Sequence, residues 1–171
     1  MNISKSPETC DMNRKKLIEQ ELFKCLQKAG EDLYLYDQDL ILKEDIQDFH
    51  AYERSICFRY GIYLNRYIEK NKMLKKYNLD AEYNRDLDEY KRLPRWENGC
   101  YPDLILHKRG TNDSNLLIVE CKGWWTSEKK RKMDREKIKE FIYSERYSYM
   151  YGVQIIFERD QLKMQRFKKE E

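Results

Sequence analysis

Glycine, proline and histidine are scarce in this chain of 171 residues, which has six glycines, three prolines and two histidines. So few glycines and prolines leave no room for a flexible linker, and the length predicts a single domain of the usual ~150 residues. The longest aliphatic run, Leu116 to Val119, is far shorter than the ~20 residues of a membrane helix, so we expect no membrane partner. The beginning of the chain has no apolar segment typical of a signal peptide. We therefore expect a cytoplasmic protein.

Cysteine and histidine are placed so that two common stabilising devices are excluded. The five cysteines are odd in number and dispersed, with no Cys-x-x-Cys pair, which is unlike a disulfide framework. Neither His50 nor His107 has a cysteine or a second histidine at the spacing of a zinc site. The chain must therefore be stabilised by its core.

Charged residues and tyrosines are abundant in this chain. Charged residues make up 38% and aromatic residues 13%, including 14 tyrosines, whereas disordered chains are poor in aromatic residues. Hydrophobic residues, at 40%, are enough for a thin core. The net charge of +3 excludes a polybasic tail as the whole function but is compatible with a local basic surface.

Hydrophobic spacing predicts two helices in the first part of the chain. Apolar residues three and four apart indicate a helix over 13–29, ended by Gly30, and a second helix over 48–70 with Asp45 or Asp48 as its N-cap. We expect residues 1–44 to form an N-terminal helical extension of a compact core, and we assign no structure to the last part of that extension.

The rest of the chain, to residue 171, predicts a mixed α/β core. The period changes to two after the second helix, and one further helix interrupts the strands. The expected elements are strands over 79–84, 101–109 and 115–122, a helix over 127–146, and strands over 152–157 and 162–167. The unit from 115 to 157 should be a parallel, right-handed strand–helix–strand crossover.

Charged residues interrupt two of these strands on one face. Asp103 shares a face with Ile105 in one strand, while Glu120 and Lys122 end an otherwise aliphatic strand. If the strands pair through the turn at 110–114, Asp103 stands beside Glu120. Two such carboxylates repel each other unless a divalent cation lies between them, and oxygen-only ligands suit Mg²⁺ or Mn²⁺. The sequence therefore predicts a metal site with a lysine next to it.

Glu53 is a further candidate. The apolar stripe of the second helix, extended backwards with the same spacing, reaches this residue. A carboxylate on a buried helix face is costly unless a partner compensates it. The alternative is an ordinary ion pair with an arginine at the start of the helix.

With Asp103 and Glu120 the chain resembles a known family. Pro102-Asp103, followed seventeen residues after Asp103 by Glu120-Cys121-Lys122, is similar to the signature of the PD-(D/E)XK, or restriction-endonuclease-like, nucleases. The similarity extends over 15–167 to a group of uncharacterised bacterial cytosolic proteins. It implies a restriction-endonuclease-like fold, with a mixed central sheet flanked by helices.

The resemblance also implies roles for these residues. Asp103, Glu120, the backbone carbonyl of Cys121 and Glu53 would bind Mg²⁺ or Mn²⁺, and Lys122 would help to activate the attacking water. The implied activity is metal-dependent hydrolysis of nucleic acid, with DNA expected over RNA because most of the family cuts DNA. Many relatives have a glutamine on the helix that follows the motif, and this chain has none between Lys122 and Tyr151.

Two other functions remain open on the same fold. One is a catalytically silent module that binds nucleic acid, and the other is a protein-assembly module that docks through residues 1–44. A homodimer or a protein partner is compatible with either. Intact Asp103, Glu120 and Lys122 argue against a silent module.

Several residues near the motif have two interpretations. The basic run Lys129, Lys130, Arg131 and Lys132 either contacts phosphates or is a solvated helix face. One of Trp124 and Trp125 is expected in the core, and an exposed one could stack on a base. The remaining residues in question are His107, expected to be packed rather than a ligand, and Glu82 and Arg85, which are either a structural ion pair or substrate contacts.

Overall fold

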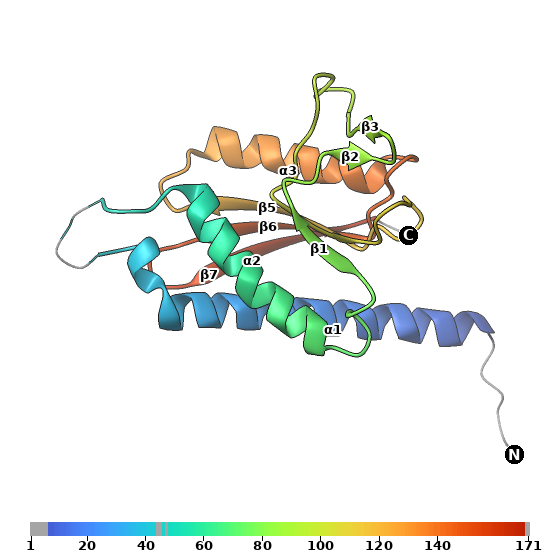
Figure 1. Ribbon diagram of the computed structural model, residues 1–171, viewed down its shortest axis with the longest axis horizontal. Helices are drawn as coiled ribbons and strands as arrows, with labels where there is room; N and C mark the ends of the chain where they lie inside the picture. Colours follow the sequence, from blue (N-terminus) through green and yellow to red (C-terminus); the bar gives the residue numbers. More distant parts are fainter. Residues whose placement is uncertain (1–6, 44–45, 47, 170–171) are drawn as a thin grey trace, which may run out of the picture.

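Three layers stack face to face in the computed structural model, which describes residues 7–43, 46 and 48–169 (Figure 1). Helices α1 (Pro7–Tyr36) and α2 (Glu53–Lys70) cover one face of a five-stranded sheet, and α3 (Glu128–Tyr143) covers the other face. The protein is thus a mixed α/β fold, as predicted.

The central sheet has the strand order β1-β4-β5-β6-β7. Only β5 and β6 run parallel, joined through α3, while every other neighbouring pair is antiparallel. This confirms the parallel crossover. The strands of this sheet are β1 (Asn78–Ala81), β4 (Leu104–His107), β5 (Leu117–Gly123), β6 (Tyr151–Phe157) and β7 (Leu162–Lys168).

Two short elements lie outside the layers and were not predicted. They are the 3₁₀ turn η1 (Gln38–Leu40) and a hairpin made of β2 (Arg85–Asp86) and β3 (Glu89–Tyr90). Strands of two residues are too short for a period of two to show in the sequence.

The prediction that Gly30 ends the first helix is wrong. Helix α1 continues to Tyr36, and Leu33 is fully buried one turn beyond Gly30. A Cβ atom at Gly30 would lie 2.9 Å from Cδ2 of Leu162, so this glycine lets the start of β7 approach the helix. The glycine serves a close contact between elements, which a local reading of the sequence takes for a helix end.

The predicted start of the second helix is also wrong. Helix α2 begins at Glu53 with Tyr52 as N-cap, and Asp48 lies before it with a positive φ of 62°. Asp45, the other proposed cap, lies outside the described residues. Glu53 is therefore in the first turn of the helix, where the partial positive charge of the helix N-terminus favours a carboxylate.

Helix α1 contributes to the main core. Leu22, Leu26 and Leu33 are fully buried in one cluster with side chains of α2 and of the sheet. The segment expected as an extension thus forms part of a layer in the fold.

A glycine also brings the other layer close to the sheet. A Cβ atom at Gly152 of β6 would lie 2.2 Å from Cγ2 of Ile138 on α3. Any larger residue would push α3 outwards, away from the end of β5.

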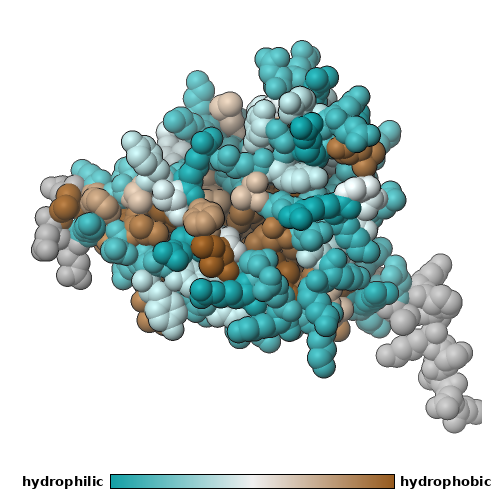
Figure 2. Space-filling model, viewed as in Figure 1, coloured by the Kyte–Doolittle hydropathy of each residue, from teal (hydrophilic) through white to brown (hydrophobic). Residues whose placement is uncertain are grey.

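Figure 2 shows that the surface in this view is largely hydrophilic, with hydrophobic side chains surfacing in its middle. Within the described part of the chain, no helix is both long enough and apolar enough to cross a membrane.

Candidate functional site

The strand pairing places Asp103 against Glu120. Leu104 pairs with Val119, so continuing the antiparallel register by one residue sets Asp103 opposite Glu120. The backbone N–H of Cys121 donates a hydrogen bond of 2.7 Å to Oδ2 of Asp103. Two carboxylates thus meet where β4 begins and β5 ends, as the sequence predicts.

Glu53, in the first turn of α2, reaches the pair of Asp103 and Glu120 from the layer formed by α1 and α2. Its carboxylate accepts hydrogen bonds from Nζ of Lys122 at 2.9 Å, the N–H of Gly123 at 3.2 Å and the hydroxyl of Thr126 at 3.3 Å. The neighbouring Arg54 pairs with Glu82 instead, at 2.9 Å. In the structure Glu53 is therefore a partner of Lys122 and not of an arginine.

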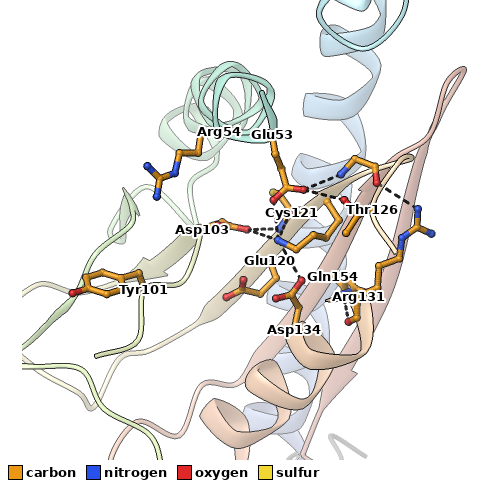
Figure 3. Close-up of polar contacts among 12 residues, drawn as sticks. Glu53, Arg54, Tyr101, Asp103, Glu120, Cys121, Thr126, Arg131, Asp134 and Gln154 are labelled. Carbon is orange, nitrogen blue, oxygen red and sulfur yellow. Dashed lines mark hydrogen bonds and ion pairs between the residues drawn. The ribbon is translucent and has the colours of Figure 1, made fainter. Parts of the chain in front are cut away.

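Oxygen atoms of four residues labelled in Figure 3 surround the ammonium group of Lys122; they belong to Glu53, Asp103, Cys121 and Asp134. The ammonium donates to the carbonyl oxygen of Cys121 at 2.8 Å and pairs with Oε1 of Glu53 at 2.9 Å. Asp134 Oδ2 lies 3.2 Å away and Asp103 Oδ2 3.8 Å away. Only 13% of the lysine side chain is exposed. We call this set of oxygen atoms, with Glu120 beside it, the oxygen ring.

Helix α3 adds two residues that the sequence analysis missed, Asp134 and Lys137. Asp134 faces Lys122, and the ammonium of Lys137 lies 2.6 Å from Oε1 of Glu120. Both could have been found, because the buried stripe of α3, which includes Ile138 and Phe141, extended backwards by helical spacing, reaches them. The argument that selected Glu53 applies equally to this helix.

Burial dominates the electrostatics of the three buried carboxylates. Loss of water raises the pKa of Glu120 well above its usual value and also raises the pKa of Asp103 and of Asp134, although the nearby ammonium groups oppose the shift. For Lys122, burial alone would lower the pKa, but the surrounding carboxylates, Asp103 foremost, raise it above its ordinary value. The lysine is therefore firmly charged at neutral pH.

The charges of the site do not balance. Four carboxylates (Glu53, Asp103, Glu120 and Asp134) face two ammonium groups (Lys122 and Lys137), which leaves a formal charge of −2 when all are ionised. Glu120 Oε1 and Asp134 Oδ2 are buried, and the ammonium groups of Lys137 and Lys122 lie 2.6 Å and 3.2 Å from them. A divalent cation would match both the missing charge and the preference of these oxygens for a hard ion.

The carboxylates converge on Lys122 rather than on an open position between them. Among the described residues, no group of three or more His, Cys, Asp and Glu side chains is arranged to hold a metal ion as it stands. The donor set fits Mg²⁺ in type and charge, and its binding would require the two lysines to move.

The basic run at the start of α3 divides into two parts. Lys129, Lys130 and Lys132 are exposed, which is compatible with phosphate contacts and with a solvated face alike. Arg131 is half-buried, and its guanidinium donates to the carbonyl oxygen of Trp124 at 2.9 Å. Arg131 thus ties the turn after β5 to α3.

The remaining candidates have structural partners. His107 is buried, and its Nε2 lies 2.9 Å from Oδ2 of Asp80, so it is packed as expected. Trp124 packs against the core, and the ring of Trp125 stacks on exposed His50 with 3.6 Å between centroids. Glu82 pairs with a helix residue, Arg54, while the guanidinium of Arg85 lies over the ring of Tyr90.

Comparison with known proteins gives no assignment: no family model, no curated protein and no solved structure matches this chain. The chemistry of the site has to be inferred from its own atoms.

Proposed function

We propose that this protein is a nuclease of the PD-(D/E)XK type that uses Mg²⁺ or Mn²⁺ to hydrolyse phosphodiester bonds, with DNA as the expected substrate. The observation that carries the proposal is the oxygen ring around Lys122, with Asp103 opposite Glu120 at its edge. Four carboxylates gathered around two ammonium groups, with Glu120 fully buried, make ionisation of the whole set costly and call for a functional reason.

The residues proposed as metal ligands are Asp103, Glu120, Glu53 and the carbonyl oxygen of Cys121. All are oxygen donors, which suits Mg²⁺ and Mn²⁺. When bound, such an ion supplies positive charge to the scissile phosphate and its leaving oxygen. The excess of carboxylates over ammonium groups at this place supports the assignment.

Lys122 has a different task in this mechanism. Because neighbouring carboxylates raise its pKa, the side chain stays protonated near neutral pH. It therefore orients the attacking water and stabilises developing negative charge, and it does not take up the proton of the water. The three backbone and side-chain donors to Glu53 hold that carboxylate next to Lys122.

The decisive test is cleavage of fluorescently labelled DNA and RNA while Mg²⁺ or Mn²⁺ is titrated. We expect metal-dependent cleavage that Glu120→Ala and Lys122→Ala each abolish. High Mg²⁺ should restore part of the activity of Glu120→Ala, which has lost a ligand, but none of the activity of Lys122→Ala. Glu97→Ala and Lys76→Ala remove exposed charges and serve as matched controls. Normal rates in both site variants would refute the assignment.

One observation favours a second candidate, a silent module that binds nucleic acid without cutting it. Lys137 already pairs with Glu120, whose side chain is 1% exposed, so the carboxylates have cationic partners in the absence of metal. Binding of the labelled oligonucleotides that is independent of metal and never followed by cleavage would favour this candidate. Absence of both binding and cleavage would point to a protein-assembly role.

A further inference from the structure

We infer that a groove between α1 and the β6–β7 side of the sheet binds the phosphate backbone of a single nucleic-acid strand. The ligand class rests on the proposed function, but the groove is separate from the oxygen ring. It encloses about 1090 Å³.

The groove is long and has two walls. One wall is a single face of α1, on which lining residues recur three and four positions apart from Met12 to Gln27. At 1.5 Å per residue this wall is ~22 Å long. The other wall is made by the end of β7, the start of β6 and the loop before it.

Positive charge is concentrated on both walls. The groove is lined by six basic residues against a single acidic one, Glu19; the basic residues are Lys15, Lys16, Lys24, Arg166, Lys168 and Lys169. Its formal charge of +5 exceeds the +3 of the whole chain, so the rest of the protein is net negative. Three of these lysines, Lys15, Lys24 and Lys168, pair with Asp11, Glu21 and Glu19 at 3.7 to 3.9 Å, which offsets part of this charge. The excess of basic groups that remains along the groove attracts a polyanion.

Arg166 favours a nucleic acid over an acidic peptide. Its guanidinium lies 4.0 Å above the ring of Phe23, and no carboxylate of the described residues lies within ion-pair distance of it. Arg166 is exposed, so the outer side of its planar guanidinium remains available. An unpaired base stacks well on such a plane, whereas a carboxylate of a peptide would accept hydrogen bonds from the N–H groups at its edge.

The groove and the oxygen ring lie at opposite ends of β6. Gly123, next to the ring, pairs with Phe157 at one end, and Tyr151 of the groove is at the other end. Lys122, at the centre of the ring, pairs with Ile156, five residues from Tyr151, so with ~3.3 Å per residue the two are ~17 Å apart along the strand. A small phosphodiester can reach the ring alone, whereas a strand of about 20 nucleotides, at ~3.4 Å each, can reach both.

The test compares two triple variants of equal charge change. The groove variant carries Lys16→Gln, Lys24→Gln and Arg166→Gln, and the control carries Lys72→Gln, Lys75→Gln and Lys76→Gln, which are exposed and outside the groove. Binding of a labelled 20-nucleotide single strand is measured in EDTA over a range of salt concentrations. Hydrolysis of a small chromogenic phosphodiester is measured separately with Mg²⁺ or Mn²⁺.

We expect the groove variant to bind the strand at least about tenfold more weakly at low salt, with a log–log salt slope lower by ~2, as removal of three phosphate contacts predicts. The control should bind like the parent, and all three proteins should hydrolyse the small diester equally. Equal weakening in both variants, or tighter binding of a duplex or of a glutamate-rich peptide, would overturn the inference. If no protein hydrolyses the small diester but strand binding still depends on the groove, the proposed function fails and the groove assignment stands.

Discussion

Strand β4 has a polar cluster next to each of its ends. The two clusters differ in the number of carboxylates for each donor side chain. At its last residue, His107 shares the carboxylate of Asp80 with Arg109. Next to its first residue, Asp103 joins the oxygen ring. In the first cluster two side chains make three hydrogen bonds to one carboxylate, whereas the second gathers four carboxylates around two lysines.

The pKa values follow this difference. Burial raises the pKa of Asp80, but hydrogen bonds from Arg109 and His107 outweigh it and leave the pKa below its usual value. The pKa of Asp103 and of Glu120 is raised, because burial outweighs their cationic partners. The ionised carboxylate of Asp80 therefore stabilises the fold at neutral pH, whereas ionising Asp103 and Glu120 costs stability. Such a cost is typical of a site kept for chemistry.

The largest expected effect separates the two clusters by activity. Glu120→Gln keeps the shape of the side chain but removes the charge of a proposed metal ligand, so we expect cleavage to fall by more than ~100-fold. Asp80→Asn, the same change in the other cluster, should leave the cleavage rate within about threefold of the parent once a folded fraction is confirmed by circular dichroism. A loss of activity in both variants would mean that the clusters are not distinct in function.

The next largest expected effect is on stability, and here the variant of the Asp80 cluster should be the more strongly affected one. Asp80→Asn leaves buried His107 and neighbouring Arg109 with one acceptor fewer, which should lower the free energy of unfolding by about 1–3 kcal/mol. Urea unfolding at pH 7 measures it, with Asp113→Asn, an exposed carboxylate nearby, as the control. If Asp80→Asn were as stable as the parent, the Asp80 cluster would not be the structural one.

The smallest effect concerns Asp103→Asn, which relieves repulsion inside the oxygen ring. In EDTA the variant should melt at the same temperature as the parent or higher, with a gain on the order of 1 kcal/mol at this partly wet site. Mg²⁺ or Mn²⁺ should stabilise the parent, because metal binds the folded site only, and the variant should lose most of that gain. A lower melting temperature in EDTA together with an undiminished metal response would assign Asp103 a purely structural role.

The same two proteins also differ in their pH dependence. The folded pKa of Asp103 is raised, so above the ordinary value of 3.8 the folded state keeps a proton that the unfolded chain has released. Its contribution to stability therefore falls as the pH rises from about 4 through the raised folded value. In EDTA, the free energy of unfolding of the parent should decrease more steeply over this range than that of Asp103→Asn. Parallel curves would contradict the shift.

The sequence predicted the parts of the fold and site that rest on local pattern. Apolar runs indicated β5 and β6, and the turn before β5 correctly suggested that Asp103 meets Glu120. Gly30 was misread because its reason, contact with Leu162, lies more than a hundred positions away in the sequence. Asp134 and Lys137 lie on the backward extension of the buried stripe of α3, but their charge makes that end of the helix look solvated. Contacts between layers and elements of two or three residues escaped prediction.

The lysine at the centre of the oxygen ring has a consequence for how the proposed metal-dependent enzyme would be assembled. Because Lys122 and Lys137 supply cations of the chain itself, the carboxylates can be gathered during synthesis without waiting for an ion from solution. Folding and metal loading then become separate, ordered events, and a chelator should leave behind a folded protein that can be recharged. The time needed for activation by metal would be set by the reorientation of the Lys122 and Lys137 side chains and not by refolding.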